Sequence, residues 1–325
     1  MKNLDNQIIV SIKCLVYNHA PYIRQCLDGF VMQKTNFRFE AIVHDDASTD
    51  GTQDIIREYA ERYPDIIRPI YETENQYSKR DGSLRRIMNE AVSPDTKYIA
   101  LCEGDDYWTD PLKLQKQVSF LDNHPDYVIC THDFFYFDQY KMGFKEGTPY
   151  SYIFAKPNNK MFFDYSLDLY FEGWWTHPLS CMYRNGQYLK DIPYIQYKKF
   201  RDDILFYYIL KEGKGALLSD NMGVYRIHGS GVWSKLSYIE QKETSMNNAY
   251  DIYLVEHDRN AFKKITRIQY EVLLYLKKEK LISDYFKKLR KYLKMDPYPF
   301  FLKLMWSITK LDLSVIYNKI KSFCV

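Results

Sequence analysis

Three short acidic clusters are the parts of this 325-residue chain with side chains suited to chemistry. They occupy residues 45–46, 103–106 and 202–203. Carboxylate oxygens are ligands that suit Mg²⁺ or Mn²⁺ rather than zinc. A positioned carboxylate can also take a proton from a hydroxyl group. For any single Asp-Asp pair, a solvated turn or a helix cap is an equally simple role. The clusters therefore indicate a functional site only when they are considered together.

Glycine-rich phosphate-binding loops are absent from the sequence. No G-x-G-x-x-G follows the first predicted strand, where residues 17–21 stand instead, and no G-x-x-x-x-G-K-[ST] occurs anywhere. Dehydrogenases of the dinucleotide-binding type and P-loop proteins are therefore excluded. A diphosphate bound without a glycine cradle needs another source of positive charge, and a divalent metal on a few carboxylates is the usual one. Glu103, Asp105 and Asp106 could supply such a site, or they could form a solvated turn before the helix that starts near Pro111.

The elements that must position these clusters alternate between short apolar runs and helix-like stretches. Strands are predicted over residues 8–16, 39–44, 66–71 and 98–102, and helices after residue 21, after residue 50, over 82–92, after 111 and over 202–211. This alternation predicts βαβ crossovers and an α/β fold with a mainly parallel sheet flanked by helices. Ligands of such sheets bind at the carboxyl ends of the strands, which is where the first two acidic clusters fall.

Charge is divided unevenly along the chain. The net charge is +3, but residues 235–325 carry 18 Lys and Arg against 10 Asp and Glu, which leaves the preceding 234 residues acidic. Nucleic-acid binding normally needs a basic folded surface, so an acidic body with a basic tail argues against it. The tail has helical periodicity and contains Tyr298, Trp306 and Tyr317 among lysines. We expect it to rest on a membrane surface as a peripheral contact, or to act as a helical cap or homodimer contact.

The expected compartment is the cytoplasm, with the inner face of the plasma membrane as the alternative. The six cysteines form no C-x-x-C pair and no regular spacing, so neither a zinc site nor a disulfide framework is indicated. The first residues lack the apolar segment of a signal peptide. No run of 18 uncharged apolar residues is present, so no membrane-spanning helix is expected.

Several motifs in order resemble the signatures of family 2 glycosyltransferases with the GT-A fold. They lie at residues 10–18, 45–52, 98–106, 201–203 and 225–234. The resemblance is good over about residues 8–130 and thinner to about 234. It implies a GT-A domain over residues 1–234, with a nucleotide-binding half at 1–130 and an acceptor half at 131–234. A helical C-terminal region would occupy 235–325.

The resemblance implies where the nucleotide of a sugar donor would bind. Leu15, Tyr17 and Asn18 would lie beside the nucleobase. Asp46 would accept the imide N–H of uracil, which favours a UDP-sugar as donor. Arg80 lies in a stretch from which a basic residue can reach the nucleotide, although a solvated loop is an equally good interpretation.

A metal site is also implied by the resemblance. Asp105 would bind the Mn²⁺ or Mg²⁺ that bridges the diphosphate oxygens. Asp106 and Glu103 would either ligate this metal or orient the groups that do. The family more often has Asp at the place of Glu103. His228 lies in a segment resembling the family's C-terminal loop over the diphosphate. It would complete the metal shell, hydrogen-bond a phosphate, or simply pack.

The resemblance places catalysis at the third acidic cluster. Asp203, with Asp202 beside it, would act as the general base on an acceptor hydroxyl; helix capping is the alternative. Trp174 and Trp175 would stack on an acceptor sugar or belong to the core. The implied reaction is inverting transfer of a hexose or related sugar to a glycan or lipid-linked acceptor in cell-surface polysaccharide synthesis. A sugar-nucleotide nucleotidyltransferase and a catalytically silent nucleotide- or glycan-binding protein remain the alternatives.

Overall fold

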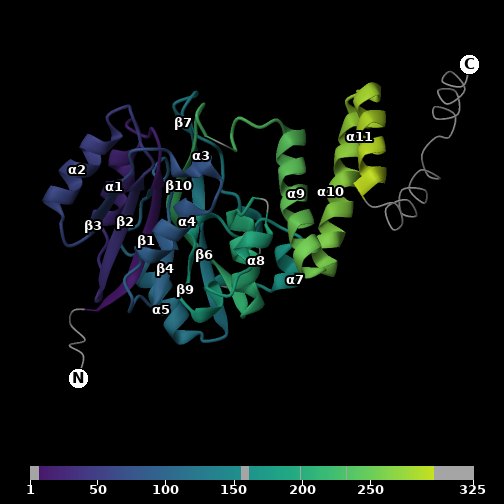
Figure 1. Ribbon diagram of the computed structural model, residues 1–325. Helices are drawn as coiled ribbons and strands as arrows, with labels where there is room; N and C mark the ends of the chain where they lie inside the picture. Colours follow the sequence, from purple (N-terminus) through teal and green to yellow (C-terminus); the bar gives the residue numbers. More distant parts are fainter. Residues whose placement is uncertain (1–6, 155–160, 198, 232, 296–325) are drawn as a thin grey trace, which may run out of the picture. The chain divides into compact units, whose positions relative to one another are not determined.

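The computed structural model describes residues 7–154, 161–197, 199–231 and 233–295. The chain divides into two compact units, residues 1–235 and 236–325 (Figure 1). The predicted membrane-contacting residues Tyr298, Trp306 and Tyr317 lie outside the described residues.

The first unit is built on one sheet that has ten strands in the described part of the chain, with the order β3-β2-β1-β4-β9-β6-β10-β5 and with β7 and β8 paired to β6 and β10. The strands are β1 (Ile8–Val16), β2 (Arg38–Asp45), β3 (Ile67–Tyr71), β4 (Tyr98–Leu101), β5 (Tyr107–Trp108), β6 (Tyr127–Asp138), β7 (Gly143–Phe144), β8 (Phe162–Tyr165), β9 (Met182–Arg184) and β10 (Lys214–Ile227). The pairs β3–β2, β2–β1, β1–β4 and β6–β10 are parallel, and the shorter strands pair antiparallel.

Helices cover both faces of this sheet (Figure 1). They are α1 (Ile23–Val31), α2 (Thr52–Arg62), α3 (Gln76–Lys79), α4 (Ser83–Glu90), α5 (Lys113–Asn123), α6 (Ser151–Phe154), α7 (Leu167–Tyr170) and α8 (Asp202–Lys211). Side chains of β1 alternate between the faces. Cys14 points to Cys26 of α1, with 3.9 Å between their Sγ atoms, whereas Leu15 packs against the cluster that includes Met88 of α4. The predicted α/β fold, a mainly parallel sheet flanked by helices, is confirmed.

Two long strands were not predicted from the sequence. β6 and β10 pair in parallel along most of their length, with register shifts between Lys214 and Gly215 and on both sides of Asn221. Thr131, His132 and Asp133 of β6 are all buried. Because these polar side chains interrupt the apolar alternation, the pattern of a strand is hidden in the sequence.

The second unit is a helical bundle of α9 (Tyr238–Glu256), α10 (Arg259–Lys278) and α11 (Ile282–Met295). Ser237 and Glu240 form a capping box at the start of α9. The core contains Met246, Val272 and Tyr292. These helices confirm the predicted helical appendage, and none of the described helices is long and apolar enough to cross a membrane.

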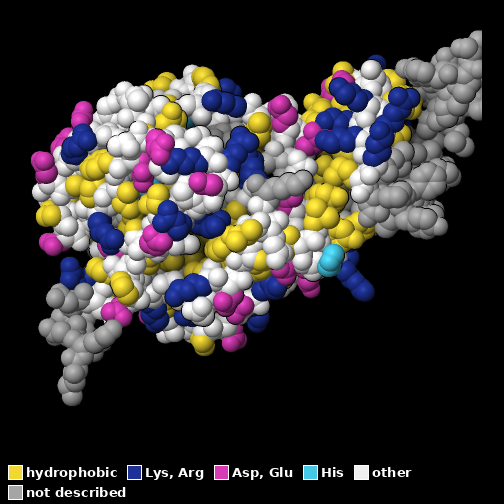
Figure 2. Space-filling view, viewed as in Figure 1, with side chains coloured by type: hydrophobic (Ala, Val, Ile, Leu, Met, Phe, Trp, Pro, Cys, Tyr) yellow, Lys and Arg dark blue, Asp and Glu magenta, His cyan; other side chains and the backbone are white. Residues whose placement is uncertain are grey.

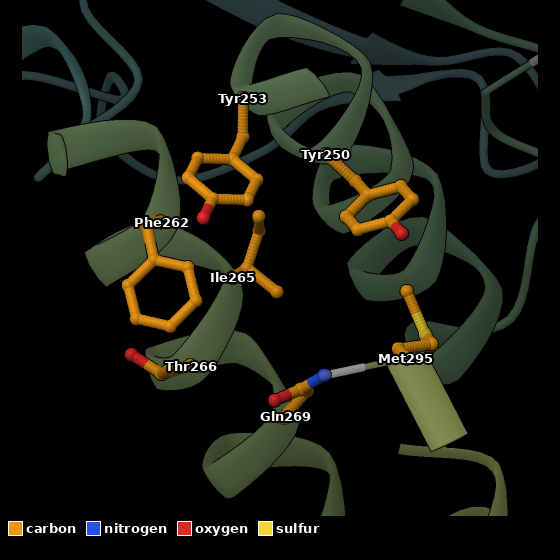
Figure 3. A pocket seen from close by; sticks show the side chains of 7 residues that line it. All are labelled: Tyr250, Tyr253, Phe262, Ile265, Thr266, Gln269 and Met295. Carbon is orange, nitrogen blue, oxygen red and sulfur yellow. The ribbon is translucent and has the colours of Figure 1, made fainter. Parts of the chain in front are cut away.

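A small pocket lies inside the second unit. Its lining consists of Tyr250, Tyr253, Phe262, Ile265, Thr266, Gln269 and Met295 (Figure 3). The accessible volume is ≈ 10 Å³, which is enough for about one water molecule. The pocket therefore offers no room for a substrate.

Candidate functional site

The first two acidic clusters meet at the carboxyl ends of neighbouring parallel strands. The backbone N–H of Asp46, after β2, donates to the Val16 carbonyl of β1 at 2.9 Å, and that of Gly104, after β4, donates to the Leu15 carbonyl at 3.0 Å. A Cβ atom at Gly104 would come within 2.9 Å of both Val16 Cγ2 and His19 Nδ1. Only glycine lets the loop of residues 103–106 lie this close to the end of β1.

Asp105 lies at the centre of the site and contacts two imidazoles. His228 Nε2 is 3.0 Å from Asp105 Oδ2, and His19 Nε2 is 3.7 Å from the same oxygen. Burial opposes ionisation of Asp105, but the hydrogen bond with His228 and the charges of His19 and His228 hold its pKa below the usual value. His228 is itself fixed, because its Nδ1 is 2.7 Å from Ser230 Oγ. The structure thus joins a residue after β10 to the loop after β4.

Arg226 of β10 fastens the same loop from the other side. Its backbone N–H donates to Asp106 Oδ1 at 2.8 Å, and its Nε donates to the Asp105 carbonyl at 2.8 Å. The guanidinium also donates to Gln25 Oε1 at 2.6 Å and to Gln139 Oε1 at 3.3 Å. Since Arg226 is buried, its charge offsets part of the negative charge collected around it.

The remaining carboxylates of the site repel one another. Burial and the Asp105 charge raise the pKa of Asp106 well above its usual value. Crowding by protein atoms, together with Asp105 and Asp202, raises the pKa of Glu103 to about 8, although the Glu103 side chain is exposed. Desolvation and the Asp203 charge likewise raise the pKa of Asp202, another exposed side chain, to about 6. The second and third acidic clusters are therefore close enough to interact electrostatically.

This set of groups fits a divalent cation that is shared with a ligand. Asp105 Oδ1 and Asp106 Oδ2 are buried and lack a hydrogen-bond partner, which is costly for carboxylate oxygens. In the described residues, no group of three or more His, Cys, Asp or Glu side chains is arranged to hold a metal. Asp105 and His228 could supply two ligands, and the others would have to come from a bound diphosphate or water.

The residues predicted to line the nucleobase lie along the ends of β1 and β2. Tyr17 is 48% exposed and available to a ligand, whereas Leu15 packs partly against the core near α4. Asn18 adopts a positive φ of 54°. Its backbone N–H donates to Ser48 Oγ at 2.8 Å and its Oδ1 accepts from the Thr49 N–H at 2.9 Å. Asn18 thereby fixes the loop after β1 to the loop after β2.

Asp46 already binds backbone amides of α3. Its Oδ1 accepts from the N–H of Gln76 at 2.6 Å, and its Oδ2 accepts from the N–H of Tyr77 at 3.0 Å. Each oxygen keeps a second lone pair for a nucleobase N–H. Asp45 has a capping role, because its Oδ1 accepts from the Ser48 N–H at 2.9 Å. Arg80 ends α3 with a positive φ of 55° and is exposed.

Asp202 and Asp203 form the first turn of α8. Tyr170 Oη donates to the Asp203 carbonyl at 2.9 Å, which holds the start of the helix against α7. The two carboxylates gain stability from the partial positive charge at the helix N-terminus. The charge of Asp202 contributes to the raised pKa of Glu103. The beginning of α8 is therefore close enough to the acidic loop after β4 for their charges to interact.

The two adjacent tryptophans have different environments. Trp174 is 45% exposed and meets the buried His177 edge-on, with 5.0 Å between the ring centroids. Trp175 is buried, and its Nε1 donates to the Leu169 carbonyl at 2.8 Å. Of the two, only Trp174 has an exposed ring surface for stacking on a sugar, and Trp175 takes the core position that was the alternative for this pair.

His19 and Arg226 were not predicted as site residues. His19 lies directly after the motif at residues 10–18, and Arg226 lies inside the motif at residues 225–234, two residues before His228. Their position beside predicted site residues was the feature of the sequence from which they could have been predicted. Their contacts with Asp105 depend on the pairing of distant segments, which the sequence does not display.

Comparisons with known proteins show which family profile and which relatives this chain matches. The sequence profile of Glycosyl transferase family 2 matches residues 11–178. An uncharacterised protein of Mycobacterium tuberculosis is 37% identical over 227 residues, which are 69% of this chain and 60% of the relative. The poly(ribitol-phosphate) beta-glucosyltransferase of Bacillus spizizenii is 35% identical over 100 residues, 30% of this chain and 15% of the relative. The chain thus spans about 60% of the length of the mycobacterial relative.

Solved structures share the fold at low sequence identity. S. aureus TarS 1–349 in complex with UDP-GlcNAc has a TM-score of 0.55 at 17% identity, covering 90% of this chain and 93% of TarS. The mannosyltransferase PcManGT from Pyrobaculum calidifontis, in complex with GDP-Man and Mn²⁺, has a TM-score of 0.53 at 17% identity. That match covers 98% of this chain and 84% of PcManGT.

Proposed function

Because this chain belongs to glycosyltransferase family 2, we propose that it transfers a sugar from a nucleoside diphosphate sugar to an acceptor hydroxyl. The acceptor is a glycan or a lipid-linked glycan of a cell-surface polysaccharide, and the reaction takes place on the cytoplasmic side of the plasma membrane. The observation that carries the proposal is the meeting of Asp105, His228 and Glu103 with the start of α8. A site for the diphosphate and a site for a base thereby adjoin.

The donor occupies the carboxyl ends of β1, β2 and β4, with a UDP-sugar as the preferred donor. Tyr17 lies along the nucleobase, Asn18 holds the two loops together, and Asp46 accepts the uracil N–H. Related structures with UDP-GlcNAc and with GDP-Man support a nucleotide-sugar site of this kind. The ionised carboxylate of Asp46 can only accept hydrogen bonds. It therefore favours uracil, which presents an N–H group, over a base that presents a hydrogen-bond acceptor at the same place.

Asp105 and His228 hold a divalent cation, Mn²⁺ or Mg²⁺, on the diphosphate. When bound, this cation supplies positive charge where the leaving diphosphate becomes more negative. Arg226 keeps the Asp105 carboxylate in place, because it donates hydrogen bonds to the Asp105 carbonyl and to the Asp106 carboxylate in the same loop. The unpartnered oxygens Asp105 Oδ1 and Asp106 Oδ2 support a cation at this position.

Asp203 acts as the general base, with Asp202 beside it. The carboxylate removes the proton of the acceptor hydroxyl while the oxygen attacks the anomeric carbon from the side opposite the diphosphate, so the configuration inverts. Trp174 offers an exposed aromatic face to the acceptor sugar. No covalent intermediate with the enzyme is needed.

A transfer assay with Asp203→Asn tests the proposal. The full chain is incubated with a panel of nucleotide sugars, a glycan or lipid-linked acceptor and Mn²⁺, and nucleoside diphosphate release is measured together with the glycosylated product. Loss of a general base lowers kcat by roughly 10²–10⁴-fold. Asp54→Asn, which removes an exposed carboxylate from the first turn of α2, is the matched control and should retain full activity.

Other results would count for the alternatives. Release of inorganic pyrophosphate from a nucleoside triphosphate would identify a nucleotidyltransferase. Tight nucleotide-sugar binding without turnover for any donor and acceptor would identify a binding protein. Equal activity of Asp203→Asn and Asp54→Asn would remove Asp203 from the role of base.

The metal site is tested by binding rather than by turnover. Calorimetric titration of UDP should show strong binding only with Mn²⁺ or Mg²⁺ present, and Asp105→Asn should lose that dependence on metal. Unchanged metal dependence in Asp105→Asn would contradict the assignment.

A further inference from the structure

The helical unit presents an apolar stripe to solvent along α10. Tyr270, Leu274 and Leu281 are 46%, 51% and 44% exposed. The spacing of four residues puts Tyr270 and Leu274 on one side of α10, and Leu281 lies in the turn that follows the helix. Single exposed leucines are ordinary on protein surfaces. Tyr270, Leu274 and Leu281 are not part of the core of this unit, so folding does not require apolar side chains at these three positions. The stripe is available for a partner.

Unpaired cations surround the end of this stripe and continue along α11. The exposed members are Lys277, Lys278, Lys280, Lys287, Arg290 and Lys294. None of the six has an ion-pair partner within 4.0 Å in the part of the chain that the structure describes. By contrast, Lys288 and Lys291 of α11 both pair with Glu243. Within the described residues, the six cations therefore keep charges that no ion pair neutralises.

The spacing of three of these cations places them on one side of α11. Lys287, Arg290 and Lys294 follow at intervals of three and four residues, which aligns them along that side. Figure 2 shows dark blue side chains gathered over α11, next to a patch of hydrophobic side chains. Between residues 277 and 294, only Glu279 and Asp284 are acidic. We name the nine residues formed by the stripe and the six cations the outer face.

The combination of charges and leucines selects the class of partner. A nucleic acid would satisfy the cations, but it would leave Leu274 and Leu281 without apolar contacts. An acidic lipid bilayer satisfies both, because its phosphate groups attract lysine and arginine while leucine and tyrosine side chains enter the interfacial region. The sequence directly after Met295 continues with Phe300, Phe301 and Trp306, which are residue types of the same interface.

We propose that the outer face of α10 and α11 docks the protein on a bilayer that contains anionic lipid. Binding is peripheral, because the cations stay with the headgroups and no described helix can span a membrane. The interaction goes beyond glycosyl transfer and does not depend on it. It would confine the protein to the surface on which a lipid-linked acceptor diffuses.

Co-sedimentation of the full chain with lipid vesicles tests the proposal. Vesicles of phosphatidylcholine alone are compared with vesicles that also contain phosphatidylglycerol. The wild-type chain should bind only the second kind and should be released by added salt, because exposed charges are screened. The triple variant K287E/R290E/K294E should bind at least about tenfold more weakly, since each basic residue near the surface contributes to the attraction. L274S/L281S should also bind more weakly at the same net charge.

A charge-matched variant separates the outer face from net charge. Lys34, Lys145 and Lys190 are exposed cations of the first unit, and K34E/K145E/K190E should bind vesicles like the wild type. Equal loss in the two triple variants would overturn the proposal, as would equal binding to both kinds of vesicle. Binding to double-stranded DNA in place of vesicles would assign the face to nucleic acid. A dimer that dissociates in K287E/R290E/K294E, without vesicle binding, would assign it to a second copy of the chain.

Discussion

At the scale of single residues, the site depends on a buried arginine that contacts no predicted substrate group. Arg226 donates to the Asp105 carbonyl, to Gln25 and to Gln139, while its own backbone N–H holds Asp106. Tyr22 and Tyr107 lie on its guanidinium, at 5.0 and 4.9 Å from the ring centroids. Its removal would leave the Asp105 carbonyl, Gln25 and Gln139 without this donor, and Asp105 and Asp106 without a nearby arginine.

Arg226→Met should therefore destabilise the first unit strongly. We expect the free energy of unfolding to fall by about 3 kcal/mol, the usual cost of breaking a buried charged network. Chemical denaturation followed by tryptophan fluorescence measures this value. Arg24→Met is the control, because Arg24 forms a half-exposed pair with Glu58 that should contribute about 1 kcal/mol or less. Equal losses in the two variants would contradict the role given to Arg226.

Gly104 is the second residue on which the site geometry depends. In Gly104→Ala, the new Cβ would meet Val16 Cγ2 and His19 Nδ1 at 2.9 Å, so we expect a loss of about 1–3 kcal/mol through displacement of the loop. Gly143→Ala serves as control, since its Cβ would find only the Lys141 carbonyl, at 3.8 Å, and should change stability by no more than about 0.5 kcal/mol. Thermal unfolding of both variants distinguishes a steric clash at Gly104 from a loss of stability that any glycine-to-alanine substitution would cause.

At the scale of elements, the ends of the early strands were predictable, whereas the later strands were not. Residues 8–16 and 39–44 are mainly apolar runs, and β1 and β2 have nearly these bounds. β10 instead carries Asp220 and Asn221 in its middle, at a register shift. Its neighbour β6 precedes it by about 85 residues in the chain, so neither local pattern nor local spacing reveals their pairing. The contact of Arg226 with Asp105 could not be predicted for the same reason, whereas the resemblance had already implied that His228 lies near Asp105. The catalytic role of Asp203 stays a prediction.

Helix α5 contains a lysine that is enclosed in the core. Lys113 is fully buried, its Nζ donates to Gln117 Oε1 at 2.6 Å, and it lies 3.9 Å from the ring centroid of Trp108. Burial lowers the pKa of Lys113 to about 8. In the unfolded chain the pKa is about 10.4. Between these values the unfolded state binds more protons than the folded state, so stability attributable to Lys113 increases with pH.

The free energy of unfolding of the wild type relative to Lys113→Met should therefore increase by up to about 3 kcal/mol from pH 8 to pH 10.4. Below pH 8 the difference should be constant. Lys116→Met is the control on the same helix, because ion pairs with Asp110 and Asp220 outweigh desolvation and raise the pKa of Lys116. Its difference from the wild type should not grow over this interval. A flat difference for Lys113→Met would mean that the lysine stays charged in the core.

At the scale of the whole molecule, the chain consists of two compact units with separate cores. The proposed donor site uses only residues of the first unit, and the outer face uses only residues of the second. Domains of this kind generally unfold as distinct cooperative blocks. A ligand that binds one folded block stabilises that block alone.

Differential scanning calorimetry should accordingly show two transitions, of which UDP with Mn²⁺ moves only one. At a ligand concentration of about 100 times Kd, the gain is about 2.7 kcal/mol, which shifts the transition of the larger unit upward by roughly 5–10 °C. Removal of the metal with a chelator should reverse the shift. A single transition, or an equal shift by UDP without metal, would contradict this description.

The position of β10 in the sheet has a consequence for synthesis of the protein on the ribosome. Arg226 and Asp106 are separated by 120 residues in the chain, yet they share a hydrogen bond in the interior. While the ribosome is still translating β10, the nascent chain already contains the acidic loop, His19, β1, β2 and β4, but neither Arg226 nor His228. Until then the carboxylates have no cationic partner from β10, and the sheet has an open edge at β6. Completion of the proposed site and closure of that edge thus become one late event, which ties assembly of the site to the protection of the newly made chain from aggregation.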